Sequence, residues 1–323
     1  MTQILQKRAP ALSVRAGHLA LQLIEKEGLQ ASFVDTIPGA AGGPKGIGIQ
    51  GLDQAIFGDF FAQTPQRRTL IGSSIGSWRF ASILAWGAKE GTERLSELYT
   101  NLYFHKKMSR QDVGNICRGM LIDLIQGKEQ QLVNHPDYHL TVISIKAQHI
   151  FQSDKSFPLL ASIAGIVGSN ALGRKHNRLF MQRVISQPSS GQQFTVEDDF
   201  VTHYQTLNSD NVTPWLMASA SIPGVMAAIR DIPDAPKGSY RDGGLIDYHI
   251  DLPFESQGIV LYPHFSDRIT PGWFDKMFKS RKANPKNQAR TLLLSPSVEY
   301  LQSLPLGRLP DRKDFTLKGL DQK

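Results

Sequence analysis

The sequence predicts an α/β protein with a mostly parallel central sheet covered by helices. Two observations carry this prediction: residues 31–58 and 67–90 each have the pattern of a strand, a glycine-rich turn and a helix, and one unit closely follows the other. Consecutive units of this kind place their strands parallel in one sheet. The 323 residues are 41% hydrophobic and 20% charged, which is ordinary for a globular chain that buries a large core.

The other elements follow from hydrophobic spacing and from residues that end helices. Residues 12–28 have helical spacing and end at Gly28, and residues 89–135 are expected to be mainly helical. A helix is also expected from Thr213 to its stop at Pro223. Strands are expected at 139–146, 177–185 and 258–264.

Two further segments have unusual compositions. Residues 157–173 are apolar and rich in small residues but too short to span a bilayer, so a buried helix and loop is expected, with a flap over the substrate as the less favoured alternative. Residues 267–323 are rich in Lys, Arg and Pro. We therefore expect a catalytic domain at 1–266 and a partly helical, basic C-terminal appendage at 267–323, packed on or next to it.

Charge and cysteine content limit the classes of function. The net charge of +7 suits an anionic partner such as a membrane surface, although many soluble proteins are equally basic, and no zinc-finger spacing, aromatic RNA-binding signature or long basic run supports nucleic acid. The single cysteine, Cys117, excludes a disulfide framework and a multi-cysteine metal site within one chain. With no signal-peptide core and no bilayer-length apolar run, we expect a cytoplasmic protein that could bind a membrane peripherally.

The segment from Gly72 to Gly76 provides a candidate nucleophile. Its sequence, Gly-Ser-Ser-Ile-Gly, fits the Gly-x-Ser-x-Gly turn that joins a strand to a helix, with small residues two positions before and after Ser74. The turn would place the Ser74 hydroxyl at a helix N-terminus, where developing negative charge is favoured. The pattern alone is weak, because a glycine-rich chain contains it by chance.

Two other segments could assist such a serine. The glycine-rich residues 42–46 follow a strand one unit earlier, and their amides could hold an oxyanion, although a phosphate loop or an ordinary turn has the same pattern. Asp242 precedes Gly243 and Gly244, which would let a carboxylate approach another backbone closely; this tripeptide alone is usually a turn.

Together and in this order, these segments resemble the patatin-like phospholipases. The family has a Gly-rich oxyanion loop, a Gly-x-Ser-x-Gly nucleophile, an Ala-Ser-x-Ala-x-Pro segment that residues 218–223 match, and an Asp-Gly-Gly or Asp-Gly-Ala motif. The resemblance spans roughly residues 30–255 and implies a three-layer α/β/α sandwich and a lipid acyl hydrolase that needs no metal or organic cofactor. It implies that Ser74 and Asp242 form a catalytic dyad, with Gly72 and Gly76 in the nucleophile turn, Gly243 and Gly244 beside the aspartate, and Gly42, Gly43, Lys45 and Gly46 at the oxyanion.

The resemblance has departures that motivate a second hypothesis. Ala40 and Ala41 replace the Asp and Gly that usually begin the oxyanion loop, and Ser221 replaces a small alanine. The alternative is therefore a catalytically inactive patatin-like protein that binds lipid.

Two alternatives concern the chemistry. His264 follows a predicted strand and could complete a Ser, Asp, His triad, but the dyad is favoured because Asp242 matches a motif and His264 stands alone. Separately, residues 46–51 read Gly-x-Gly-x-x-Gly, and Arg67 and Arg68 could contact a 2′-phosphate, so an NADP-binding oxidoreductase is a remote alternative.

Residues 271–282 could bring the protein to its substrate. Helical spacing would align four large apolar side chains among basic ones, as in helices that lie in an anionic membrane interface, although most such stripes pack on their own domain. The predicted membrane contacts are Trp273, Phe274, Met277 and Phe278. The expected substrate is a phospholipid or another acyl ester; the sequence gives no indication of the oligomeric state.

Overall fold

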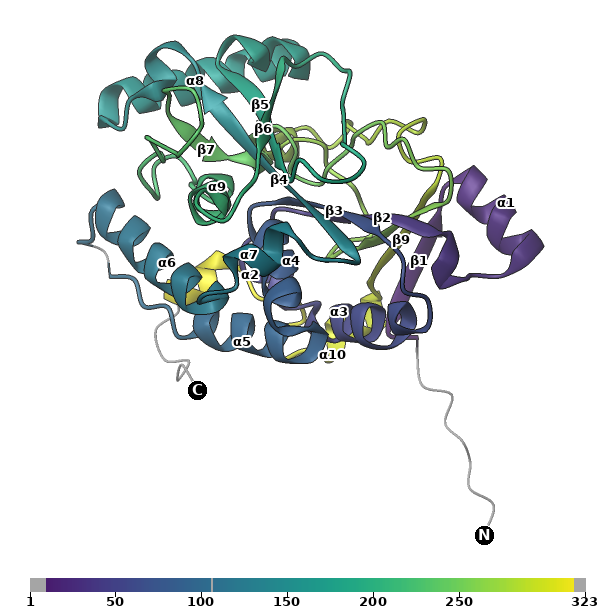
Figure 1. Cartoon of the computed structure of the whole chain (residues 1–323). Helices are drawn as coiled ribbons and strands as arrows, with labels where there is room; N and C mark the ends of the chain where they lie inside the picture. The colour runs from purple at the N-terminus through teal and green to yellow at the C-terminus, as the bar shows by residue number, and fades with distance from the viewer. Residues whose placement is uncertain (1–9, 106, 317–323) are drawn as a thin grey trace.

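The computed structural model describes residues 10–105 and 107–316, which form a mixed sheet of nine strands with helices packed on it (Figure 1). The strand order is β1-β9-β8-β2-β3-β4-β5-β6, and β7 pairs with β4. Five strand pairs are parallel and three are antiparallel, which confirms the predicted mostly parallel sheet. The strands are β1 (Leu12–Ala16), β2 (Val34–Gly39), β3 (Arg68–Ser73), β4 (Tyr138–Ala147), β5 (Met181–Gln187), β6 (Thr202–Thr206), β7 (Tyr240–Asp242), β8 (Ile259–Pro263) and β9 (Thr291–Pro296).

Helices lie on both sides of the strands. In Figure 1, α4, α5 and α6 lie below the sheet and α8 lies above it. The α-helices are α1 (His18–Glu27), α2 (Pro44–Ile47), α3 (Gln50–Asp53), α4 (Ile75–Trp86), α5 (Ala88–Thr100), α6 (Arg110–Ile125), α7 (Glu129–Val133), α8 (Ser156–Leu172), α9 (Val212–Ser219) and α10 (Val298–Ser303). Among these described helices, none has the length and apolar character needed to cross a bilayer.

Helix α4 is the centre of the larger hydrophobic core. Every residue from Ile75 to Ala85 is buried, so the helix is enclosed on all sides. Its one charged residue, Arg79, is neutralised by a bidentate contact with Asp53, at 2.8 Å and 2.5 Å. Because α4 is fixed in this way, the turn that precedes it is also fixed.

Several predicted elements differ from the structure. Residues 12–16 were expected to begin a helix, but they form β1, because their backbone pairs with β9 from Leu12 opposite Pro296 to Ala16 opposite Leu292. Sequence spacing did not indicate β9, and the predicted boundary between 266 and 267 falls between the paired strands β8 and β9. Residues 1–9, where an export signal was judged absent, and residues 317–323 of the predicted appendage lie outside the described residues.

The sheet and α4 meet most closely at Gly76. A Cβ atom at this position would lie 1.9 Å from the carbonyl oxygen of Gly39, at the end of β2. By contrast, Gly119 lies in α6 with open space around it. Packing therefore requires glycine at position 76 but not at position 119.

We predict that Gly76→Ala lowers the free energy of unfolding by at least about 2 kcal/mol, because strand and helix must separate to admit the methyl group. Gly119→Ala is the matched control and should raise that free energy by about 0.5–1 kcal/mol. Urea denaturation followed by circular dichroism measures both. Equal stabilities for the Gly76→Ala protein and the wild type would contradict the packing.

Candidate active site

Ser74 lies in a tight turn between β3 and α4, as its motif predicts. Its backbone has φ 54° and ψ −126°, a conformation that residues with side chains seldom adopt. Gly72 makes the turn possible, because a Cβ atom there would lie 2.4 Å from the Cα of Ser77. The turn holds the hydroxyl of Ser74 at the C-terminal end of β3.

Strands β3 and β7 meet end to end along one edge of β4. They share this edge because β5 occupies the other edge over the same residues of β4. β3 runs parallel to β4 and ends with Ser73 opposite Ile143, whereas β7 runs antiparallel and ends with Asp242 opposite Ser144. The two strand ends therefore converge, and the Ser74 hydroxyl donates a hydrogen bond to Oδ2 of Asp242 at 2.9 Å.

The glycines after Asp242 allow this convergence. A Cβ atom on Gly243 would lie 2.3 Å from the carbonyl oxygen of Ile143, so only glycine fits between β4 and the aspartate. The amide of Gly244 donates to Oδ1 of Asp242 at 2.7 Å. One carboxylate oxygen is thus held by the backbone, and the other is directed at Ser74.

Burial gives Asp242 the properties of a base. Loss of water around the carboxylate raises the pKa of Asp242 to about 6, an effect partly offset by the hydrogen bonds from Gly244 and Ser74 and by the charges of Arg312 and Lys276. A carboxylate with this pKa is ionised at neutral pH and still binds a proton more readily than an exposed one.

Ser219 is a site residue that the sequence analysis missed. Its hydroxyl accepts a hydrogen bond from the amide of Ser74 at 2.8 Å and donates to the carbonyl of Ile143 at 2.6 Å. It therefore ties the strained turn to β4. The sequence contains a signal for it, because Ser219 belongs to the segment 218–223 that resembles the family. Ser221 of the same segment also contacts the site, since its carbonyl accepts a hydrogen bond from the amide of Asp242 at 3.0 Å.

The glycine-rich loop lies against the dyad. Ala41 and Gly42 line the same cavity as Ser74 and Asp242. Within the described ranges, the amides of Gly42 and Gly43 have no hydrogen-bond acceptor. These donors are consequently free to bind an oxyanion. The alanine departure has a packing role, since the methyl groups of Ala40 and Ala41 are buried in a hydrophobic cluster with Tyr248 and Phe265.

Neither Lys45 nor Gly46 lines this cavity. The ammonium group of Lys45 forms an ion pair with Asp311 at 3.3 Å, and Gly46 packs against Ile75. The ion pair draws the C-terminal segment over the loop and brings Arg312 to the site.

Arg312 is the second residue that the sequence analysis missed. Its Nε lies 3.3 Å from the position that a Cβ atom on Gly43 would occupy, and its side chain lines both cavities beside Ser74. Arg312 belongs to no recognised motif and lies near the C-terminus, far in sequence from the segments that carry the motifs. In the part of the chain that the structure describes, no carboxylate forms an ion pair with Arg312.

Two apolar cavities that open to solvent meet at Ser74, with about 530 Å³ and 930 Å³ of space when the openings are included, and Ile222 and Arg312 line both. The smaller cavity is also lined by Asp242, Ile163, Leu245, Trp273 and Phe274. The larger is also lined by Trp78, Leu102, Val113, Cys117 and Met226. An ester bond at Ser74 could therefore have an apolar group on each side.

His264 lies in a buried ring cluster and does not bridge the dyad. Its Nδ1 accepts a hydrogen bond from the amide of Ser266 at 2.8 Å, and its ring packs edge-to-face on His249 at 4.3 Å between centroids. Burial lowers the pKa of His264 to about 3, so the imidazole resists protonation. The structure joins Ser74 to Asp242 directly, without an imidazole between them.

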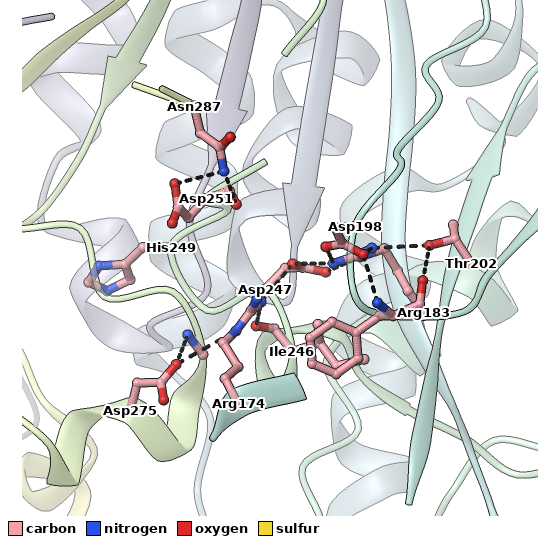
Figure 2. Close-up of polar contacts among 12 residues, drawn as sticks. Arg174, Arg183, Asp198, Thr202, Ile246, Asp247, His249, Asp251, Asp275 and Asn287 are labelled. Atoms are coloured by element: carbon pink, nitrogen blue, oxygen red, sulfur yellow. Dashed lines mark hydrogen bonds and ion pairs between the residues drawn. The ribbon is translucent and has the colours of Figure 1, made fainter. Parts of the chain in front are cut away.

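Buried ion pairs fix the segment that follows Asp242 (Figure 2). Arg183 of β5 donates to both oxygens of Asp247, at 2.6 Å and 3.0 Å, and also to Asp198. Arg174 donates to a carbonyl of the same segment at 2.8 Å. Removing one partner of a buried pair costs about 3–5 kcal/mol because the other charge is left unpaired, so Arg183 and Asp247 each require the other.

The Gly-x-Gly-x-x-Gly segment has a packing role. Gly46 lies in α2 and Gly48 directly follows it, and added Cβ atoms there would meet Ile75 at 2.8 Å and Leu309 at 2.7 Å. The guanidinium of Arg68 is buried and donates to backbone carbonyls, and Arg67 donates to a carbonyl at 3.1 Å. Of the residues that the structure describes, no group of three or more His, Cys, Asp and Glu is placed to hold a metal ion.

The predicted membrane contacts do not share one helical face. Residues Trp273–Met277 form a short 3₁₀ turn in place of the expected amphipathic helix, and Phe274 is only 3% exposed because it packs in a core cluster. Trp273 and Met277 are exposed, and Phe278 is half-buried. The prediction of a single face is wrong for Phe274, which lines the cavity at Ser74.

A scan of protein-family models and a search of curated proteins each found no match to this chain. The function is therefore inferred from the geometry of the site.

We predict that hydrolysis of an uncharged, soluble ester rises with pH through a midpoint of about 6, because Asp242 must lose its proton to act as a base. Arg312→Ala removes a positive charge that lowers the pKa of Asp242, so its midpoint should move to higher pH. Arg308→Ala is the control, because Arg308 is paired with Asp314 on the surface. A midpoint that is unchanged or lower in Arg312→Ala would contradict this assignment.

Proposed function

We propose that this chain is a serine hydrolase of lipid acyl esters, of the phospholipase A or lysophospholipase type, built on a patatin-like three-layer α/β/α fold. The observation that carries the proposal is the 2.9 Å hydrogen bond between the hydroxyl of Ser74 and the buried carboxylate of Asp242. A serine hydroxyl becomes a nucleophile when an adjacent base can accept its proton. The strained turn and the free amides of the glycine-rich loop supply the other requirements of acyl transfer.

In the first step, Ser74 attacks the ester carbonyl. Its oxygen forms a bond to the carbonyl carbon while its proton passes to Asp242, and the amides of Gly42 and Gly43 bind the oxyanion. The carbon–oxygen bond to the alcohol then breaks, and Asp242 returns the proton to the departing oxygen. The acyl group remains bonded to Ser74 as an ester.

In the second step, water releases the acyl group. Asp242 accepts a proton from the attacking water, the same amides bind the second oxyanion, and the bond between the acyl carbon and Ser74 breaks. The proton then passes from Asp242 to the oxygen of Ser74. The products are a fatty acid and the original hydroxyl, so no metal or organic cofactor is needed for these steps.

The cavities favour a lipid as the substrate. Both are lined mainly by aliphatic and aromatic side chains and meet only at Ser74, Ile222 and Arg312. A fatty-acyl chain on one side of the ester and an apolar leaving group on the other would match this arrangement. A phospholipid is the first substrate class to test.

The alternative of an inactive lipid-binding protein has less support from the site. The departure at Ala40 and Ala41 motivates it, yet the amides next in the chain, on Gly42 and Gly43, have no acceptor among the described residues. A protein that only binds lipid would not need a raised pKa at Asp242 or a strained backbone at Ser74.

We predict that Ser74→Ala and Asp242→Asn each lower fatty-acid release from phospholipids by at least about 1,000-fold. Ser74→Ala removes the attacking oxygen, and Asp242→Asn removes the base that accepts its proton. His264→Asn should keep activity within about tenfold of the wild type, because Asn can still accept the hydrogen bond from the amide of Ser266. Release is measured from diacyl and lyso phospholipids side by side. A near-total loss in His264→Asn with a mild effect of Asp242→Asn would reverse the assignment of the base.

Thermal unfolding separates lost chemistry from lost structure. The pKa of Asp242 is raised by burial, so the folded protein loses stability as the pH rises from about 4, where the unfolded carboxyl ionises, through about 6, where the folded one does. Asp242→Asn cannot carry that charge and should therefore unfold at the same or a higher temperature than the wild type at pH 8, with no such gain at about pH 4.

A further inference from the structure

Helix α8 has an unusual composition for a helix on the outside of a protein. Its 17 residues, Ser156–Leu172, contain no Asp, Glu, Lys, Arg or His. Figure 1 places the helix at the outer edge of the molecule. An outer helix usually presents charged residues to water, so this composition requires an explanation.

One face of α8 is both apolar and exposed. Phe157 is 83% exposed, Leu160 65% and Leu172 84%. Positions three, four, seven, eleven and fifteen after Phe157 lie on the same side of a helix, and they hold only apolar or small residues. We call this surface the outer face of α8; it consists of Phe157, Leu160, Ala161, Ala164, Gly168 and Leu172.

The opposite face already holds α8 to the protein. Leu159 and Ile166 are buried in a core cluster that includes Phe151 and Phe274. Asn170 donates a hydrogen bond to Asp275 at 3.0 Å. The outer face is thus not needed to hold α8 in place, and its exposed side chains are available to another partner.

The outer face lies next to the entrance of the site. Ile163, on the side of α8 between the two faces, lines the smaller cavity at Ser74 together with Trp273 and Phe274. Trp273 and Met277, in the turn Trp273–Met277 that contacts α8, are also exposed apolar side chains. A partner bound to the outer face would therefore be close to the bond that Ser74 attacks.

Positive charge borders this surface. Lys155 precedes α8, and Lys175 and Arg178 follow it, all three exposed. The one acidic residue in the sequence from 149 to 180 is Asp154. Arg230 and Arg241 neutralise it through ion pairs of 2.7 Å and 2.9 Å.

We propose that the outer face of α8 inserts into the interface of an anionic phospholipid bilayer and so places the acyl chains at the entrance of the Ser74 cavity. Apolar side chains enter the acyl region, the helix lies in the membrane plane, and the flanking Lys and Arg residues contact the headgroups. Binding of the outer face of α8 to a membrane does not depend on the proposed function, whereas delivery of substrate to Ser74 rests on it.

The test compares vesicle binding by the full chain and by Phe157→Ser/Leu160→Ser. Both proteins also carry Ser74→Ala, so that vesicles are not consumed. We expect the α8 variant to bind vesicles of phosphatidylcholine and phosphatidylserine at least about tenfold more weakly, while the same pair of changes in the active enzyme leaves hydrolysis of a soluble short-chain ester unchanged. Binding of equal strength in the two proteins would overturn the proposal.

A matched control keeps this result specific. Val14→Ser/Val298→Ser removes two side chains that are 60% and 64% exposed, on β1 and α10, and should bind vesicles like the wild type. A loss equal to that of the α8 variant would overturn the assignment to α8. So would a wild-type dimer, seen by light scattering, that Phe157→Ser/Leu160→Ser converts to a monomer, because a second copy would then cover the face.

The charge requirement has its own readout. Lys175→Gln/Arg178→Gln should weaken binding to vesicles that contain phosphatidylserine and reduce its dependence on salt. Equal binding of the wild type to pure phosphatidylcholine vesicles would overturn the anionic part of the proposal. If vesicle binding depends on α8 but no ester is hydrolysed, the proposed function fails and the membrane surface is supported.

Discussion

The pairing of β3 and β7 with one edge of β4 is the constraint on which the site depends. Ser74 and Asp242 are 168 residues apart in the chain, and they meet because a ten-residue strand accommodates two shorter strands of opposite direction end to end. A slip of one residue in β7 would turn the carboxylate of Asp242 to the other face of the sheet. This junction depends on the strained turn at Ser74, on the absence of a side chain at Gly243 and on the hydrogen bonds of Ser219.

The same junction determines how readily Asp242 binds a proton and how much its ionised form destabilises the folded protein. Asp242 is enclosed between β4, the loop at Gly42 and the segment that follows it, and this enclosure raises its pKa. A buried carboxylate is a better base than an exposed one and is also less stable when ionised. The ion pairs of Arg183 hold Asp247, in the segment after Asp242, in position (Figure 2). The network that fixes this segment thus lies outside the contact between Ser74 and Asp242.

The elements that sequence could predict are those that need fixed residue types at fixed spacing. The turn at Ser74 and the glycines beside Asp242 are of this kind, because only glycine tolerates the close approaches found there. Elements that depend on long-range pairing were missed: β1 is a strand because β9 lies beside it, and neither segment shows this alone. Arg312 reaches the site through an ion pair of its neighbour Asp311 with Lys45, which no local pattern records. Segment 157–173 is expected to be a buried helix and loop, and the structure confirms the helix. The expected burial is wrong for one face of this helix, because apolar residues indicate burial only when something covers them.

We propose that Ser74 is a nucleophile activated by direct contact with Asp242. The most direct measurement is peptide mapping by mass spectrometry after reaction with a fluorophosphonate, which bonds covalently to activated serines. The wild type should carry the label on Ser74 at pH 8, and Asp242→Asn should react at least about 100-fold more slowly while remaining folded. A label on another serine, or an Asp242→Asn protein that reacts on Ser74 at the wild-type rate, would contradict the claim.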